Sequence, residues 1–377
     1  MKFSKSLLIL SLLLFLNACK QEKTSPVNNN TNTLIKYSKG FDIQIFDNYK
    51  KLIIKSPYPD AEEAFAYIIV PKGNEIPDSL KNHKIIRTPV DKLVVTSTTH
   101  IPMLELLEVE NTLVGFPNLK YISSAKTRAR IDKGLITELG NEESINTEIL
   151  LDVSPELLIG FSMSNNNKMF NTIEKAGIPV VLNGDWLEET PLGRAEWIKF
   201  FAVFFDKEKE ADSIFKGIEQ EYIEAIAIAK KATRKPTVLS GVLFKDIWNL
   251  PAGDSFVAQF LKDANTDYLW ADSEGKGSLS LSFESVYDKG QNAEFWIAPG
   301  HYNSLEQLEN ANEHYTKFEA FQKKNVFSFT LKKGETGGAL YYELAPVQPH
   351  IVLKDIIKIT HPELLEDYTP FYLELLQ

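Results

Sequence analysis

Cysteine is almost missing from this sequence, whose 377 residues include only Cys19. A single cysteine excludes an intrachain disulfide, so the folded part of the chain must be stabilised by an apolar core rather than by covalent cross-links. The composition permits such a core, because 44% of the residues are hydrophobic and 24% are charged. The length is sufficient for two domains.

Excess positive charge and long apolar runs are missing as well. The formal net charge is −10 and no stretch of the sequence forms a basic stripe. This excludes a nucleic-acid partner, because phosphate binding depends on a basic surface. Beyond the N-terminus, no segment approaches the run of about 18 apolar residues that a membrane-spanning helix needs.

The N-terminal segment has the pattern of a secretory signal. Lys2 and Lys5 precede an apolar run from Leu7 to Leu16, which is too short to span a membrane. The tetrapeptide Leu-Asn-Ala-Cys that ends at Cys19 resembles the lipobox of bacterial lipoproteins, in which the cysteine is acylated and becomes the new N-terminus. We therefore expect a signal peptide at 1–18 and an exported protein anchored by lipid to the inner or the outer membrane. A free thiol that follows an apolar segment is the alternative.

The rest of the chain divides by pattern into a tether, a small sheet and two similar lobes. The polar residues at 19–33 predict a disordered tether. Three short apolar runs parted by turn residues predict an antiparallel β-meander at 34–90. Strands alternate with helices at 91–205 and again at 233–377, which predicts an α/β fold with one parallel sheet in each lobe. The region between the lobes, 206–232, is the longest expected helix.

Two consecutive helices are expected around this connection. The second is capped by Asp206 and runs to about Lys231, a length of roughly 37 Å at 1.5 Å per residue. Such a helix between two lobes predicts a rigid spine, although its periodicity fits an ordinary surface helix of one large domain equally well. The first helix carries an aromatic stripe on one face, formed by Trp197, Phe200, Phe201, Phe204 and Phe205.

One acidic residue recurs at a similar place in both lobes. Glu148 and Glu284 each lie near the start of a short helix and precede a buried strand by nine and eleven residues, respectively. A single acid at such a place is favoured by the helix dipole, so a purely local role explains either residue alone. As a pair, they would place two carboxylates on one outer face, where a symmetric basic partner can dock.

These features resemble the ABC-importer substrate-binding proteins that capture iron complexes, haem or cobalamin. The similarity covers roughly 85–360 and is carried by EILLDVSPELLI from Glu148 to Ile159, by FESVY from Phe283 to Tyr287, and by the segment from Pro191 to Arg194. The resemblance implies two Rossmann-like lobes joined by one long helix. It also implies that the paired acids contact arginines of an ABC permease and ATPase complex, that the protein is a monomer, and that it has no cofactor and no catalytic residues.

Such a protein would bind its ligand between the lobes, in loops that follow the carboxyl ends of parallel strands. Aromatic residues there would form walls or else cap the core, and an arginine would clamp an anion or else remain solvated. His100 and Tyr302 would ligate a metal or else serve as hydrogen-bonded loop residues. The candidate contact residues are Thr98, His100, Arg128, Trp186, Lys245, Trp248 and Tyr302.

Three other classes of protein fit the sequence less well. A zinc or manganese binder needs three or four converging ligands, and only His100 and His301 lie in suitable places. An anchored hydrolase is the rival from another class, but the segment around Ser162 lacks the final glycine of a nucleophile elbow. A histidine within hydrogen-bond reach of Ser162 would nevertheless favour a hydrolase. A lipoprotein without a ligand is disfavoured by the glycine-rich and aromatic strand-end loops.

Overall fold

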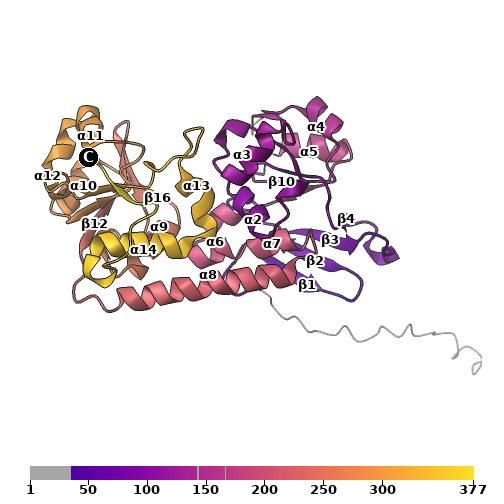
Figure 1. Ribbon diagram of the computed structural model, residues 1–377, viewed down its shortest axis with the longest axis horizontal. Coiled ribbons are helices and arrows are strands. Elements are labelled where there is room, and N and C mark those ends of the chain that lie inside the picture. The colour runs from indigo at the N-terminus through magenta and orange to yellow at the C-terminus, as the bar shows by residue number, and fades with distance from the viewer. Residues whose placement is uncertain (1–34, 142–143, 166) are drawn as a thin grey trace, which may run out of the picture. The chain divides into compact units, whose positions relative to one another are not determined.

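The computed structural model describes residues 35–377, apart from 142–143 and 166 (Figure 1). The predicted signal peptide, the predicted lipid attachment at Cys19 and the whole of the predicted tether lie outside the described residues. Within the described part of the chain, no helix is both long enough and apolar enough to cross a membrane.

A four-stranded sheet opens the described chain. Its strands lie in the order β1-β2-β3-β4, and the first three form the predicted antiparallel meander. The fourth strand was not predicted, and it pairs parallel to β3. Alternate side chains of β1, such as Phe41 and Ile43, are buried, which explains the period of two in the sequence. The strands are β1 Phe41–Ile45, β2 Lys50–Ile54, β3 Phe65–Pro71 and β4 Lys84–Thr88.

The N-terminal lobe is built on a parallel sheet in the order β11-β10-β5-β6-β7. Its central strands are apolar throughout because helices cover both faces of a parallel sheet. The strands are β5 Leu93–Val95, β6 Leu113–Phe116, β7 Thr137–Glu138, β10 Leu157–Gly160 and β11 Val180–Leu182, with a small hairpin of β8 Gly140–Asn141 and β9 Ser144–Ile145. The helices are α2 His100–Leu106, α3 Ala125–Asp132, α4 Thr147–Val153 and α5 Lys168–Lys175.

The C-terminal lobe repeats this plan in the order β15-β12-β17-β18-β19, in which only the edge strand β19 is antiparallel. A separate antiparallel sheet, β13-β14-β16, occupies segments that the sequence pattern had assigned to loops. The strands are β12 Thr237–Ser240, β13 Val242–Phe244, β14 Ile247–Pro251, β15 Asp267–Tyr268, β16 Ser278–Leu281, β17 Phe295–Ile297, β18 Val326–Ser328 and β19 Glu374–Leu375. The helices are α9 Phe256–Asp263, α10 Phe283–Gly290, α11 Leu305–Ala311, α12 Glu319–Gln322, α13 Leu340–Leu344 and α14 Pro349–Thr360.

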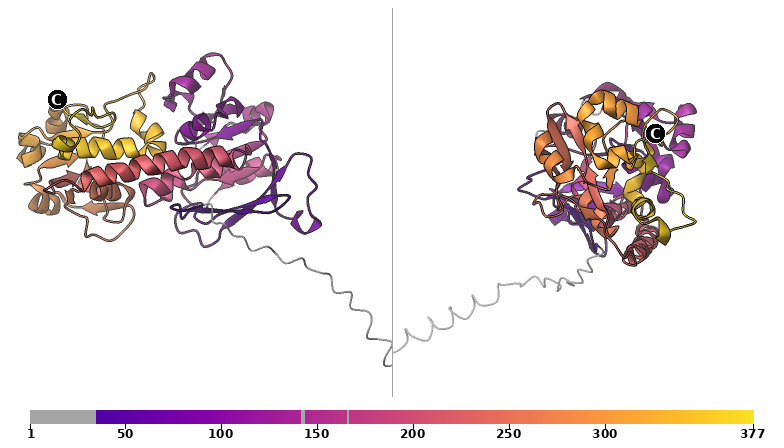
Figure 2. Two further views of the ribbon diagram at one scale, coloured as in Figure 1. Left: turned by 60° about the horizontal axis from the view of Figure 1, so that its bottom comes forward. Right: turned by 90° about the vertical axis from the view of Figure 1, so that its left-hand side faces the viewer.

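The lobes are connected by α8, Glu208–Ala229, whose 22 residues correspond to about 33 Å. It buries a stripe that includes Phe215, Ile218 and Tyr222, and it lies beside α14 (Figure 2). The long linking helix is thus confirmed, but its predicted cap is wrong. Asp206 adopts a left-handed backbone conformation with φ of 56° and pairs with Lys50 at 2.9 Å, while the residue before α8 provides no side-chain cap.

The aromatic segment before α8 does not form the single amphipathic helix that was expected. It contains one helix of a single turn, α7 Ile198–Ala202, and a second short helix, α6 Pro191–Ala195, precedes it. Ile198, Ala202 and Val203 lie off the predicted stripe and are completely buried, so the segment is buried on more than one face. Short 3₁₀ helices complete the fold: η1 Asp78–Leu80, η2 Glu110–Thr112, η3 Leu119–Tyr121, η4 Asp185–Leu187, η5 Glu313–Lys317, η6 Ala345–Val347 and η7 Pro362–Leu364.

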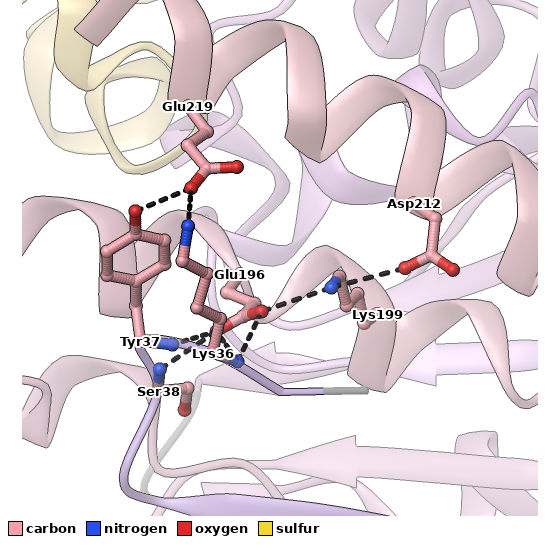
Figure 3. Close-up of polar contacts among 7 residues, drawn as sticks. All are labelled: Lys36, Tyr37, Ser38, Glu196, Lys199, Asp212 and Glu219. Atoms are coloured by element: carbon pink, nitrogen blue, oxygen red, sulfur yellow. Dashed lines mark hydrogen bonds and ion pairs between the residues drawn. The ribbon is translucent and has the colours of Figure 1, made fainter. Parts of the chain in front are cut away.

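The first described residues are bound to this aromatic segment and to α8 (Figure 3). The buried carboxylate of Glu196 accepts hydrogen bonds from the backbone N–H groups of Lys36, Tyr37 and Ser38 at 2.6 to 3.0 Å. Lys199 forms an ion pair with the same carboxylate at 3.1 Å. We call 36–38 the N-terminal strap. Its side chains reach α8 as well, because Lys36 and Tyr37 both donate to Glu219.

Candidate functional site

A cavity lies at the carboxyl ends of the parallel strands in the N-terminal lobe. Its volume is about 240 Å³. Loops that follow β5, β10 and β11 supply most of its lining, and α6 supplies the rest, because parallel strands direct their carboxyl ends to one edge of a sheet. We call this cavity the floor site; its lining residues are Ser97, Thr99, Phe161, Met163, Asp185, Trp186 and Arg194.

Arg194 places the floor site next to the C-terminal lobe. Its guanidinium lies over the ring of Phe256 in α9, 5.2 Å from the ring centroid. Within the described part of the chain, this guanidinium forms no hydrogen bond and no ion pair. The cavity therefore contains a cation whose neighbour across the lobes is an aromatic ring rather than a carboxylate.

Asp185 and Trp186 form the polar part of the floor site after β11. Asp185 is almost completely buried, and its Oδ2 accepts a hydrogen bond from Thr99 Oγ1 at 3.3 Å. The backbone N–H of Asp185 donates to Asn183 Oδ1 at 2.8 Å, which fixes the turn. The indole N–H of Trp186 is buried and has no acceptor among the described residues.

His100 lies beneath this floor and is completely buried, with its ring centroid 5.2 Å from that of Phe201. Burial lowers its pKa to about 4, against the opposing effects of the Asp185 charge and of Asn183, so the imidazole is neutral at neutral pH. A metal ion or ligand would reach His100 only if the floor opened. The ligand contact expected of this residue is thus replaced by a supporting role under Asp185.

Trp248 is also a core residue rather than an exposed wall. It is completely buried and stacks on Trp296 with 5.5 Å between ring centroids. Its indole N–H donates to the backbone carbonyl of Ser240 at 3.0 Å, which satisfies the polar atom inside the core. The wall role expected of Trp248 came from treating β14 as a loop.

The other candidate contact residues are dispersed. Thr98 is half-buried, and its neighbours in the sequence, Ser97 and Thr99, line the floor site. Arg128 donates to the Leu119 carbonyl at 2.8 Å and so holds its own loop. Lys245 is exposed at the left-handed turn between β13 and β14, and Tyr302 is half-buried against the core. Of the candidate contact residues, Trp186 alone lines the floor site.

Glu148 and Glu284 lie in the first turns of α4 and α10, one in each lobe, and both are exposed. Asn146 and Ser282 cap the two helices through side-chain hydrogen bonds. The pKa of Glu284 is lowered by its own backbone N–H and by Ser282. Neither carboxylate forms an ion pair with a described residue, so both charges are presented to solvent.

A buried carboxylate, Glu343, joins the two lobes. Glu343 of α13 is 2% exposed and accepts hydrogen bonds from the backbone N–H groups of Ser123 and Ser124, at 2.7 and 2.8 Å, at the start of α3. Ser124 also donates through its hydroxyl to Glu105 at 2.5 Å. Burial raises the pKa of Glu343 to about 7, with the N–H groups opposing this effect and the charge of Glu105 adding to it.

Arg194 and Glu343 were not among the residues predicted from the sequence, although the first lines the floor site and the second joins the lobes. Arg194 was part of the segment that carried the family resemblance, so its place before the spine was a usable signal. Glu343 has no such signal, because its partners lie about 220 positions away in the chain. The hydrolase alternative gains no support, since Ser162 Oγ donates to the Ser164 carbonyl at 2.6 Å and to Asn167. Among the described residues, no three His, Cys, Asp or Glu side chains are grouped to hold a metal.

The family model of the periplasmic binding protein matches residues 93–331, which include the floor site and both paired acids. This chain belongs to the periplasmic binding protein family. Members of this family are non-catalytic, extracytoplasmic substrate-binding proteins of ABC importers, in the cluster that handles iron-siderophore complexes, haem and cobalamin. The resemblance drawn from the sequence is confirmed, and so is the prediction of a binding protein rather than an enzyme.

Individual relatives of this periplasmic binding protein are distant. An uncharacterized lipoprotein of Methanocaldococcus jannaschii is 24% identical over 386 residues, covering 92% of this chain and 90% of the relative. A periplasmic binding protein from Veillonella parvula shares the fold with a TM-score of 0.61 at 15% identity, covering 88% of this chain and 98% of that one. A periplasmic haem-binding protein of Vibrio cholerae has a TM-score of 0.54 at 17% identity, covering 70% and 99%. At these identities, the two solved structures establish the fold.

Proposed function

We propose that this binding protein captures an iron complex, either a siderophore complex or haem, or else cobalamin, in the cleft between its lobes. The floor site supports this proposal because it lies at the strand ends of one lobe and reaches the other lobe through Arg194 and Phe256. A site shared by two lobes can hold a ligand tightly when they close on it. The structurally similar protein of Vibrio cholerae is a haem-binding protein, which supports a ligand of this class.

The proposal includes lipid anchoring at Cys19 and delivery of the ligand to an ABC permease. The lipobox pattern supports the anchor, and the Methanocaldococcus jannaschii relative is itself called a lipoprotein. The exposed, unpaired carboxylates of Glu148 and Glu284 support docking, because two such charges on separate lobes would meet two basic patches of the permease.

A ligand screen tests the binding function. The mature chain with Cys19→Ser is heated with ferric trihydroxamate, ferric triscatecholate, haem or cobalamin, and the unfolding midpoint is recorded. A true ligand at a hundredfold excess over its Kd stabilises the folded protein by about 2.7 kcal/mol, which raises the midpoint measurably. If none of the four shifts the midpoint, this ligand class is refuted.

The docking residues are tested by charge reversal. The double variant Glu148→Lys with Glu284→Lys should abolish ligand uptake by cells and leave the Kd of the purified protein unchanged. The control is Glu309→Lys, which reverses an exposed acid of α11 outside the paired positions. Uptake by the double variant at the rate of the control would refute the docking role.

A further inference from the structure

The loop that follows β11 is shared between the floor site and the N-terminal sheet. We call residues 183–189 the floor loop, because two of them, Asp185 and Trp186, line the floor site. The first part of this loop is bound to the N-terminal lobe, where the backbone N–H of Asn183 donates to the Gly160 carbonyl at 2.7 Å. Its far end is bound instead to the segment that leads into the N-terminal sheet.

Glu188 fixes the far end of the floor loop. It is 6% exposed, and its Oε1 accepts hydrogen bonds from the backbone N–H of Gly40 and from the indole N–H of Trp197, both at 2.9 Å. The backbone N–H of Lys39 donates to its Oε2 at 3.1 Å, and the hydroxyl of Ser38 donates to Oε1 as well. Three of these four donors come from the segment that leads into β1. The start of the described chain therefore holds a loop of the floor site.

Hydrogen bonds rather than close packing determine where this end of the loop lies. A second cavity, of about 410 Å³, adjoins it, and Leu187, Glu188 and Glu189 line this cavity together with Gly40 and Ser56. The loop thus has open space beside it in addition to the floor site. A binding site needs its lining groups held within about 0.5 Å by the hydrogen bonds of the surrounding residues. The contacts of Glu188 supply that restraint.

The other end of the floor loop meets the N-terminal sheet at Gly184. A Cβ atom here would lie 2.1 Å from the carbonyl oxygen of Ser56, which follows β2. The φ of Gly184 is −116°, which any residue adopts, so glycine is needed for the close approach and not for the backbone conformation. Just before the loop, the backbone N–H of Leu182 donates to the hydroxyl of Tyr67 in β3 at 3.4 Å. The N-terminal sheet and the segment before it thus contact the loop at both ends.

We propose that the N-terminal sheet and the segment that leads into it position the floor loop for ligand binding, and that Glu188 is the positioning residue. This inference rests on the proposed function, because it concerns the same site. The sheet lies ahead of residue 93, where the family match begins, so the role belongs to a part of this chain that the family model does not cover. Ligand affinity should therefore depend on residues 38–40, which line no part of the floor site.

The first test removes the positioning carboxylate and compares it with an equivalent carboxylate elsewhere. Glu188→Gln takes away the charge and one acceptor oxygen in the mature Cys19→Ser protein. The control is Asp355→Asn, because Asp355 is also buried and accepts the backbone N–H groups of three consecutive residues, 371–373, none of which lines the floor site. The Kd values of ferric trihydroxamate, ferric triscatecholate, haem and cobalamin are measured by titration. Chemical denaturation without ligand verifies that each protein is folded.

We expect Glu188→Gln to weaken binding of the probe that the parent protein binds by about tenfold, because the freed end of the loop carries the lining residues with it. Asp355→Asn should lower the stability but change the Kd by less than about threefold, since it lies at an independent place. Ser38→Ala removes one donor to Glu188 and should weaken binding by about threefold. This milder variant decides the question if Glu188→Gln does not fold.

The second test displaces the other end of the loop. Gly184→Ala places a methyl group against the Ser56 carbonyl, and its control is Gly217→Ala in α8, where a Cβ atom would meet no other atom within 4 Å. We expect Gly184→Ala to weaken the same Kd by about tenfold and Gly217→Ala to leave it unchanged. Equal Kd values for these two variants would contradict the positioning role of the sheet.

A spectroscopic readout follows the loop itself without any ligand. Each protein is labelled with 5-fluorotryptophan, and the ¹⁹F resonance of Trp186 is identified by its absence from Trp186→Phe. This resonance should shift or broaden in Glu188→Gln and in Gly184→Ala, and it should coincide with that of the parent protein in Asp355→Asn. A general loss of stability would not produce this pattern.

The outcomes separate this inference from the proposed function. If Glu188→Gln loses no more affinity than Asp355→Asn, the positioning role is overturned and the proposed function stands. If the parent protein binds none of the four probes, the proposed function fails, and the Trp186 resonance still decides the positioning role. An identical resonance in Glu188→Gln and the parent protein overturns that role, and a changed resonance supports it.

Discussion

Two buried carboxylates hold distant segments of this protein together, and they differ in how their charge is balanced. Glu196 binds the backbone N–H groups of the N-terminal strap and has Lys199 beside it at 3.1 Å. Glu343 binds two N–H groups across the lobes, but its charged neighbour is Glu105, another acid. Both use the same hydrogen-bond chemistry. The contact of Glu343, which has an acid rather than a cation beside it, is therefore conditional on pH.

The largest effect is expected from breaking the balanced contact. Glu196→Gln keeps the volume but removes the charge and one of the two acceptor oxygens, so N–H groups of the strap lose an acceptor and Lys199 keeps only its pair with Asp212 among these two carboxylates. We expect the free energy of unfolding to fall by about 3 kcal/mol, because the altered side chain is completely buried and binds several groups at once. Chemical denaturation measures this change. The control Glu219→Gln alters a more exposed acid that also contacts the strap. If Glu219→Gln lowered the free energy of unfolding as much as Glu196→Gln does, the special role of the buried carboxylate would be contradicted.

The unbalanced contact should respond to pH. The pKa of Glu343 is raised from 4.5 to about 7 when the lobes are joined. The joined state therefore favours the protonated acid, is most stable below about pH 4.5, and weakens as pH rises through 7. Between pH 4.5 and pH 7, the joined state loses stability on the order of 3 kcal/mol.

Fluorescence energy transfer between the lobes measures this response. Dyes are attached to Lys133→Cys and Lys317→Cys in the Cys19→Ser background, which is otherwise free of cysteine. The separation in the absence of ligand should increase between pH 5 and pH 8. Glu343→Gln, which cannot ionise, should abolish the pH dependence. A separation that changes with pH equally in both proteins would contradict the assignment to Glu343.

The smallest effect is expected at an exposed counterpart of these carboxylates. Glu189 pairs with Lys39 at 3.0 Å and with Lys276 at 2.5 Å, but both lysine side chains are at least 70% exposed. Solvent screens such pairs, so Glu189→Gln should change the free energy of unfolding by less than about 1 kcal/mol. A change as large as that of Glu196→Gln in the same denaturation experiment would show that burial is not what separates the two classes.

The sequence analysis predicted the repeated α/β plan because short apolar runs such as Leu157–Ile159 are buried on both sides in a parallel sheet. It failed where long-range packing overrides local periodicity. The Trp197 to Phe205 stripe predicts one helix, but only Ile198–Ala202 is helical, as α7, and side chains off the stripe are buried as well. The sequence pattern predicts that Trp248 is an aromatic residue of a loop. In the structure, β14 pairs with β16, which covers Trp248. Contacts such as Glu343 with Ser123 depend on folding and have no local signature.

The strap also determines where a mechanical load would enter the molecule. Because Lys36 and Tyr37 are bound to Glu196 and Glu219, a pull on the chain ahead of residue 36 is first resisted between α6 and α7 and in the middle of α8. The strands that form the floor site do not lie on this path. Tension applied ahead of residue 36 would therefore act on the segment between the lobes, two residues from Arg194 of the floor site.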